Sequence, residues 1–459
     1  MTATLAVWAA RARRRGASAT GAAGGGGLTG RLADLPAVLA VLAFATATWA
    51  ALAVAGGTVA FVHRADAPGA VDEDGVYPLL AAISCVLLVV PVATLGGAAA
   101  RLTVARRNDR LAKLRLMGAT GLQVAGLAVL DTTLEAVTGA GAGLAVWAVS
   151  LPALARVRFQ GRAFAVAELV PDAAILLAVP AAVLLIALTS CAASLRRVAI
   201  TPLGVARRVT PRRLSPARIL PLLVLAGAFV AVTRAGPGFA DSDRARAVAA
   251  AVLLALIGGT FAVYNLVGPL LIGLLGRLLA RTARTPATLL AARQLVDDPR
   301  SAWRGVGGVA LVTFVAGCLS IVPGLRSTPG NQDRVLADIG TGAAATLAIA
   351  ALMAAVSTGV TQAARVLDQA PQYRALHLGG ADLAVLHAAR SRQTWIPLAV
   401  TMGGAGLTSL VIVSPVAALL ASAGVRGVAV FVLSAVSGAG LVLVASRASR
   451  PLVVAVSRP

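Results

Sequence analysis

Long apolar stretches alternate with short polar ones along almost the whole chain. A helix that crosses a bilayer needs roughly 20 mostly apolar residues. Ten stretches meet or approach this length: residues 35–62, 77–100, 122–150, 172–195, 219–233, 247–275, 305–323, 341–363, 394–413 and 427–446. The pattern predicts an all-α, polytopic membrane protein with ten transmembrane helices.

The positive charges gather on one side of the predicted membrane. When the N-terminus is placed inside, the inner segments hold 31 of the 41 Lys and Arg residues, and the five outer loops hold 10. Cytoplasmic segments of membrane proteins carry such an excess of Lys and Arg. The charge distribution therefore predicts that both termini are cytoplasmic.

The composition excludes an ordinary soluble domain. Hydrophobic residues make up 58% of the chain, charged residues 13%, and the mean hydropathy is +0.86. The net charge of +23 is spread over six inner segments beside helix ends, which favours contact with anionic membrane lipids over binding of nucleic acid. The three histidines and three cysteines are dispersed, so the sequence predicts no metal site, no cofactor and no catalytic residues.

An internal repeat appears at an offset of 262 residues. The sequence Leu-Arg-Leu-Met-Gly-Ala-Thr at 114–120 aligns without gaps on Leu-His-Leu-Gly-Gly-Ala-Asp at 376–382. Each copy follows the second helix of a four-helix group and precedes a helix that leads back into the membrane. We therefore expect two four-helix groups in the same orientation, related by an axis along the membrane normal and joined by two bridging helices.

The predicted organisation has five parts. They are a flexible, basic and Gly-rich cytoplasmic tail (1–34), a first four-helix repeat (35–208), bridging helices 5 and 6 with a cytoplasmic linker (209–304), a second four-helix repeat (305–450) and a cytoplasmic tail (451–459). No loop between the predicted helices is long enough to fold as a domain with its own core.

Residues 106–120 carry the densest signal for a function. Read as a helix that ends at Gly118, they place Leu111 and Leu114 on one face and the basic side chains elsewhere. A short amphipathic helix on the cytoplasmic side suits two roles. It could lie on the lipid surface or dock in a groove of a cytoplasmic partner.

The motif at 114–120, followed by a helix with Asp131 and a run of alternating glycines, resembles the FtsX-like permease family. These proteins are the membrane subunits of ABC transporters of the MacB and bacitracin-exporter type. Residues 200–207 resemble the family's Pro-x-x-Ala-Leu-Arg closing segment, and the ten-helix plan resembles the bacitracin-exporter branch. Members of the two branches have a large extracellular domain after helix 1 or between helices 7 and 8, where this chain has only residues 63–76 and 324–340.

The resemblance implies a permease in a bacterial cytoplasmic membrane that works with a cytoplasmic ABC ATPase, two copies per permease. This chain has no phosphate-binding loop of its own, because its sole lysine, Lys113, is followed by Leu114. We therefore expect ATP hydrolysis in a separate subunit and no enzyme activity in this chain. The implied ATPase-coupling residues are Arg110, Leu111, Leu114, Arg115 and Gly118 in the first copy and Leu376, His377 and Gly380 in the second.

Two acidic residues lie inside a predicted span. Asp131 and Glu135 are four residues apart and share one helix face. Ionisable groups within a membrane often mark function. Alternatively, Asp131 lies near the cytoplasmic end of its helix and Glu135 pairs with an arginine or a backbone group.

Glycine clusters within the apolar stretches predict close helix packing rather than nucleotide binding, because they do not stand at strand-to-helix turns. They are Gly139, Gly141 and Gly143, Gly403, Gly404 and Gly406, and Gly438 and Gly440.

Two functions remain open. The first is a permease that exports or extracts an amphipathic or lipid-like molecule. The second is a non-transporting membrane scaffold or signal transmitter that relays ATPase motion to another protein.

Overall fold

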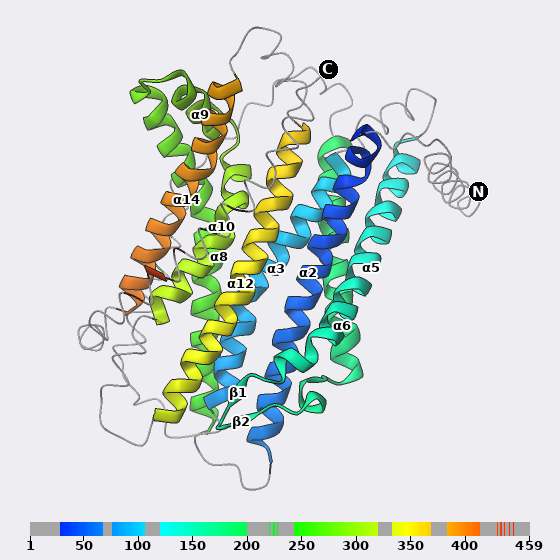
Figure 1. The fold of residues 1–459 in the computed structure, drawn as a ribbon, viewed down its shortest axis with the longest axis vertical. Helices are drawn as coiled ribbons and strands as arrows, with labels where there is room; N and C mark the ends of the chain where they lie inside the picture. Colours follow the sequence, from blue (N-terminus) through cyan, green and yellow to red (C-terminus); the bar gives the residue numbers. More distant parts are fainter. Residues whose placement is uncertain are drawn as a thin grey trace.

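The computed structural model consists mainly of long helices (Figure 1). It describes residues 28–67, 76–105, 120–199, 243–319, 333–368 and 383–413, with single helical positions at 220, 224, 227, 429, 432, 433, 436, 440 and 444. The helices are α2 (Leu28–Ala65), α3 (Val76–Ala105), α5 (Gly121–Leu154), α6 (Ala173–Ala199), α8 (Asp243–Thr282), α9 (Pro286–Asp297), α10 (Pro299–Leu319), α12 (Asp333–Asp368) and α14 (Leu383–Val413). A two-stranded ribbon, β1 (Arg158–Phe159) and β2 (Arg162–Ala163), and the 3-10 helix η2 (Val166–Leu169) stand between α5 and α6.

Five of the predicted spans are confirmed as helices long and apolar enough to cross a membrane. They are Ala37–Ala65, Tyr77–Ala99, Ala125–Leu154, Ala173–Ala193 and Ala337–Ala363. The helices α8, α10 and α14 also cover predicted spans. The predicted spans 219–233 and 427–446 fall largely outside the described residues. In its described part the chain is therefore an all-α membrane protein that carries one short ribbon.

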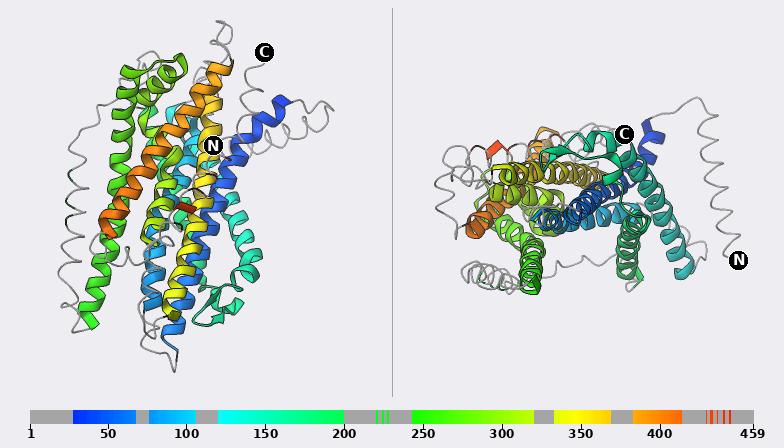
Figure 2. Two further views of the ribbon diagram at one scale, coloured as in Figure 1. Left: turned by 60° about the vertical axis from the view of Figure 1, so that its left-hand side comes forward. Right: turned by 90° about the horizontal axis from the view of Figure 1, so that it is seen from below.

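The helices run between two ends of a bundle (Figure 1). We call the end with the β1–β2 ribbon the ribbon end, and the end with α9 the α9 end. Helix α2 packs against α3 and α5, and α10 packs in the same way against α12 and α14. Helices α3 and α12 contact each other in the middle of the bundle, with α5 and α6 on one side and α8 and α14 on the other (Figure 2).

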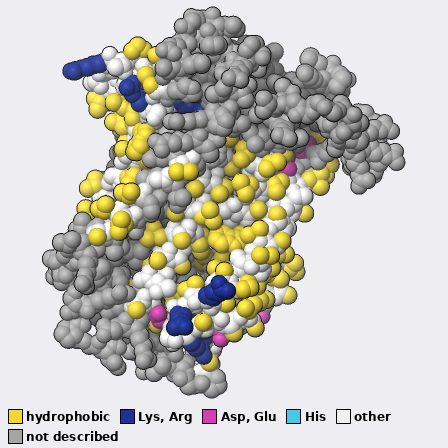
Figure 3. All heavy atoms as spheres, viewed as in Figure 1, with side chains coloured by type: hydrophobic (Ala, Val, Ile, Leu, Met, Phe, Trp, Pro, Cys, Tyr) yellow, Lys and Arg dark blue, Asp and Glu magenta, His cyan; other side chains and the backbone are white. Residues whose placement is uncertain are grey.

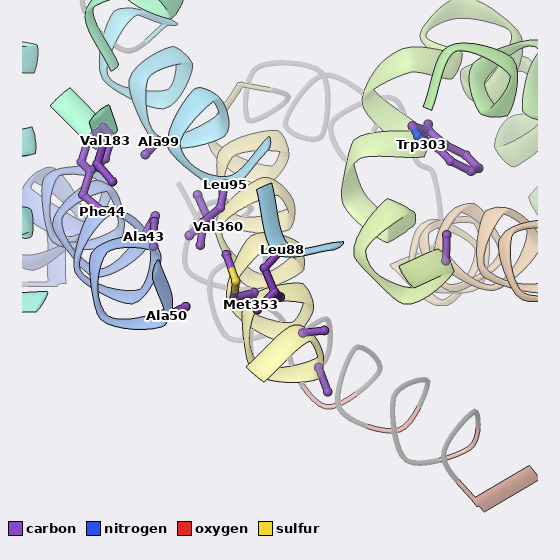
Figure 4. Packing of buried hydrophobic residues seen from close by; sticks show 14 of the residues in the cluster. Ala43, Phe44, Ala50, Leu88, Leu95, Ala99, Val183, Trp303, Met353 and Val360 are labelled. Atoms are coloured by element: carbon purple, nitrogen blue, oxygen red, sulfur yellow. The ribbon is translucent and has the colours of Figure 1, made fainter. Parts of the chain in front are cut away.

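An apolar core extends across both sets of helices (Figure 4). It includes Phe44 of α2, Leu95 of α3, Trp303 of α10 and Met353 of α12, each exposed by 3% or less. Large apolar side chains also cover much of the visible outer face, as in Figure 3. Val149, for example, is 82% exposed. Apolar groups on both the inside and the outside are what a bundle surrounded by lipid requires.

Helices α2 and α5 approach closely at two glycines one turn apart. A Cβ on Gly139 would lie 2.6 Å from the Cβ of Phe44. A Cβ on Gly143 would overlap the carbonyl oxygen of Ala45 and lie 2.8 Å from the Cβ of Thr48. Small residues four apart let two helix backbones come together in this way. The predicted role of these two glycines is confirmed.

The same prediction is wrong for three other glycines. A Cβ on Gly141, Gly403 or Gly440 would meet nothing within 4 Å. Gly141 lies between the two contact positions in sequence, but a two-residue step along a helix turns the side chain to a different face. The sequence pattern locates the cluster without showing which members touch a neighbour.

Three further parts of the chain contain elements that the sequence pattern does not specify. Residues 28–34 of the predicted flexible tail are helical and belong to α2. The connection between the predicted spans 247–275 and 305–323 contains helix α9, which the side chain of Thr285 caps. The connection between the predicted spans 122–150 and 172–195 contains the ribbon and η2. A search for apolar stretches of membrane length overlooks such short elements, because their apolar faces are only a few residues long.

The α2–α5 contact provides a matched pair of variants. Gly143→Ala should destabilise the bundle by about 1–3 kcal/mol, because the methyl group has no room against Ala45 and Thr48. Gly141→Ala should be neutral or stabilising by up to about 1 kcal/mol, since alanine is the better helix former and its methyl group meets open space. Unfolding in a denaturing detergent titration measures both. Equal effects of the two variants would contradict the described packing.

Candidate functional site

The most elaborate polar arrangement in the described residues lies at the ribbon end. The ribbon is an antiparallel pair in which Phe159 faces Arg162 across a two-residue turn. Both turn residues have positive φ, 55° at Gln160 and 75° at Gly161. This conformation is that of a type I′ hairpin turn, whose twist matches the twist of the two strands.

Arg64, in the last turn of α2, holds the ribbon in place. Its Nε and Nη2 donate to Glu168 Oε2 at 3.0 and 2.6 Å. Nη2 also donates to the carbonyl oxygen of Ala163 at 3.1 Å, and Nη1 donates to Gln160 Oε1 at 3.2 Å. The Arg64 side chain is only 3% exposed. A guanidinium buried to this degree is stable because its donors are used and its charge is paired.

Aromatic rings fill the space beneath the ribbon. Phe61 stacks on Tyr77 with centroids 5.6 Å apart, and it meets Phe159 and Phe164 edge-on at 5.1 and 5.4 Å. The Arg64 guanidinium carbon lies 4.2 Å from the centre of the Phe164 ring. These contacts join the ends of α2 and α3 to the ribbon in one buried cluster.

Asp338, in the second turn of α12, brings a distant part of the chain to this cluster. Its Oδ2 accepts a hydrogen bond from the Tyr77 hydroxyl and another from the backbone N–H of Gln160, both at 2.7 Å. The carboxylate therefore ties α12 both to α3 and to the ribbon.

Asp131 and Glu135 lie elsewhere, in the first half of α5. Asp131 is 4% exposed, beside the fully buried Thr132, and Glu135 is half-buried. Asp131 lies six residues past Ala125, where the apolar span begins, which is about 9 Å along the helix axis. This depth agrees with the interpretation that Asp131 lies near one end of its helix. The hydroxyl of the adjacent Thr132 donates to Cys191 Sγ of α6 at 3.5 Å, and the described residues contain no group of three or more possible metal ligands.

The predicted ATPase-coupling residues lie outside the described residues. They are Arg110, Leu111, Leu114, Arg115, Gly118, Leu376, His377 and Gly380. The first described residue after the first segment is Thr120, which caps α5. Its Oγ1 accepts from the Gln123 N–H at 3.4 Å, and its own N–H donates to Gln123 Oε1 at 3.0 Å. The motif at 114–120 therefore ends at a helix start fixed by a capping box.

A second polar link joins elements at the α9 end. Arg392 Nη1, on α14, donates to the hydroxyls of Thr285 and Thr288, both at 2.8 Å. Thr285 is the residue that caps α9. The link fixes the start of α9 to α14.

Sequence reasoning missed Arg64, Glu168, Asp338 and Arg392. One signal was available, because Gln160-Gly161 between Phe159 and Arg162 has the length and the glycine of a hairpin turn. The partners of Arg64 are about 100 residues away, and Asp338 lies 261 residues from Tyr77, so no local pattern could indicate those contacts. The site contains groups that position helix ends.

Arg64 should decide whether the ribbon stays folded. Arg64→Ala leaves Glu168 and three acceptors of the ribbon without their donor, at a cost on the order of 2–3 kcal/mol. We expect chymotrypsin, added from the ribbon side, to cleave much faster after Phe159 and Phe164, which are buried in the intact protein. The exposed Arg158 is the control, since Arg158→Ala should leave cleavage unchanged. If chymotrypsin cleaved Arg64→Ala no faster than Arg158→Ala, Arg64 would not hold the ribbon in place.

Comparison with known proteins gives no independent assignment. Searches against protein-family models, curated proteins and solved structures find no match for this chain. The resemblance to FtsX-like permeases stays a prediction that depends on the motif residues of the sequence.

Proposed function

We propose that this chain is the transmembrane subunit of an ABC transporter of the FtsX-like type. It is driven by a separate ATPase and exports or extracts an amphipathic or lipid-like molecule. The observation that carries the proposal is the agreement between the 262-residue sequence repeat and the arrangement of the described helices.

Helix packing supports the two-copy plan. Helix α2 contacts α3 and α5, just as α10 contacts α12 and α14. In each set, a long helix packs against the two long helices that follow it across the 262-residue offset.

One contact supports a two-fold relation between the copies. The hydroxyl of Thr346 on α12 donates to the hydroxyl of Ser84 on α3 at 3.0 Å, and these residues are 262 positions apart. Residues that meet their own counterparts lie at a two-fold axis. We place this axis between α3 and α12, along the length of the bundle.

The helix starts also support the ATPase contact. Thr120 is the N-cap of α5, and Asp382 is its counterpart 262 residues later in the sequence. Both residue types cap helices well. Each motif would then sit at the start of a long helix at the α9 end, and a push on that segment would reach the membrane through a rigid rod.

The ribbon end supports a small or lipid-like substrate. Among the described residues, its folded connection is the ribbon with η2, and aromatic rings and Arg64 fill the space beneath it. Such an element offers little space to enclose a large ligand. A molecule dissolved in the membrane could instead reach the bundle from the side.

The relay function has one observation in its favour. The ribbon is attached to α2 through Arg64 and to α12 through Asp338, so relative motion of the two helices would move it. Substrate transport by the purified complex separates the two functions. Lipid or drug transport supports the permease, whereas ATPase coupling with no transport of any amphiphile supports the relay.

The proposed function predicts a defined complex. The tagged chain, purified from its own membrane, should carry two ATPase subunits per permease in native mass spectrometry. Leu114→Asp should remove most of the bound ATPase, because an unpaired charge in an apolar docking groove costs on the order of a few kcal/mol.

The matched control is the same change elsewhere at the α9 end. Leu289 of α9 is 42% exposed and lies outside both predicted coupling segments, so Leu289→Asp should keep the ATPase bound. A wild-type chain that never co-purifies with an ATPase would refute the proposed function. Normal ATPase binding by Leu114→Asp would refute the coupling segment.

A further inference from the structure

Asp338 differs from the other polar residues of the α3–α12 contact. Deeper in the bundle, the two helices meet through the hydroxyls of Ser84 and Thr346 at 3.0 Å, and through apolar side chains. At the ribbon end, a carboxylate accepts two hydrogen bonds at 2.7 Å. Hydrogen bonds to an ionised acceptor are roughly twice as strong as neutral ones and depend more sharply on geometry.

Both donors to Asp338 are held in place by their own surroundings. The Tyr77 ring is 4% exposed and stacks on Phe61, which fixes the direction of its hydroxyl. The Gln160 N–H belongs to the turn of the ribbon, and the Gln160 side chain accepts from Arg64. The two donors to the carboxylate are therefore supplied by α3 and the ribbon, and residues of α2 hold both donors in position.

From this arrangement we infer that Asp338 is a latch between the two sets of helices at the ribbon end. With the carboxylate in its position, the ends of α3 and α12 are held together and the ribbon lies across them. When Asp338 leaves its position, the remaining α3–α12 contacts are a hydroxyl pair and apolar surfaces, which tolerate sliding and tilting. Release of Asp338 is then the step that lets the two helices separate at this end while the α9 end stays packed.

In the proposed function, this separation opens the ribbon end of the transporter. The link between this separation and transport rests on the proposed function, but the latch itself is a property of the isolated chain. Asp338 is a positioning residue, since it acts through the helices and the ribbon that its two hydrogen bonds join. Its effect is therefore measured as a distance rather than as a rate.

The test uses two spin labels in the full chain in lipid nanodiscs. The native cysteines Cys85, Cys191 and Cys318 are replaced by alanine, and single cysteines are introduced at Arg162 of the ribbon and Ala344 of α12, both exposed. In the parent chain, which keeps Asp338, we expect a single short distance between the labels at positions 162 and 344. Asp338→Ala should add a longer-distance population, raised at least about tenfold by the loss of two charge-assisted hydrogen bonds.

Two further variants show how much individual hydrogen bonds contribute to holding α3 and α12 together. Tyr77→Phe removes one of the two donors and keeps the stacked ring, so it should give a smaller open population than Asp338→Ala. Ser84→Ala removes the neutral hydrogen bond between the same two helices and should leave the distances as in the parent. A larger change from Ser84→Ala than from Asp338→Ala would overturn the latch.

A second label pair separates release from unfolding. One label is placed at His63 of α2 and the other at Arg162 of the ribbon, and both positions are exposed. The distance between these labels should be the same in Asp338→Ala as in the parent, because Arg64 still holds the ribbon on α2. Unchanged distances for the Arg162–Ala344 pair in Asp338→Ala would refute the latch and leave the proposed function standing. A change in the His63–Arg162 pair would also refute it, since the carboxylate would then maintain the fold of the ribbon.

Discussion

The absence of water in the hydrocarbon core of a bilayer shapes every described part of this protein. Each polar group of a spanning helix must find its partner inside the protein. The backbone does so by forming helices, and many hydroxyls do so by donating to a carbonyl one turn earlier, as Thr46 does to Leu42 and Thr132 to Ala128. With these groups satisfied within one helix, helices meet mainly through apolar surfaces and glycines, as at Gly139 and Gly143.

Apolar surfaces hold helices together but define their relative position weakly, because the attraction has no direction. Directional links are therefore most effective at the ends of the bundle, where water can also solvate charges. Arg64 and Asp338 supply them at the ribbon end, and Arg392 supplies one at the α9 end. The two ends are thus fixed by a few hydrogen bonds each, whereas the helices between them meet mainly through apolar side chains and a few neutral hydrogen bonds, such as that of Thr346 to Ser84.

The sequence predicts the long helices well, because an apolar stretch of membrane length can satisfy its backbone hydrogen bonds in a membrane in few ways other than as a helix. Helices α5 and α6 begin at Gly121 and Ala173, each within one residue of the start of its predicted span. The helix α9 and the ribbon escape such an analysis, since a four-residue apolar face such as that of α9 is too short to stand out. The site at the ribbon end could not be predicted, because Arg64 and Asp338 each contact residues about 100 or more positions away.

Orientation in the membrane is the claim on which the proposed ATPase coupling at the α9 end depends. It is tested by single cysteines at exposed positions in a chain without native cysteines. Arg158 and Ala337 lie at the ribbon end, and Thr120 and Arg293 lie at the α9 end. A membrane-impermeant maleimide added to intact cells should label the first pair and reach the second only after lysis. Labelling of Thr120 and Arg293 in intact cells, with Arg158 and Ala337 protected, would contradict the predicted cytoplasmic location of the α9 end.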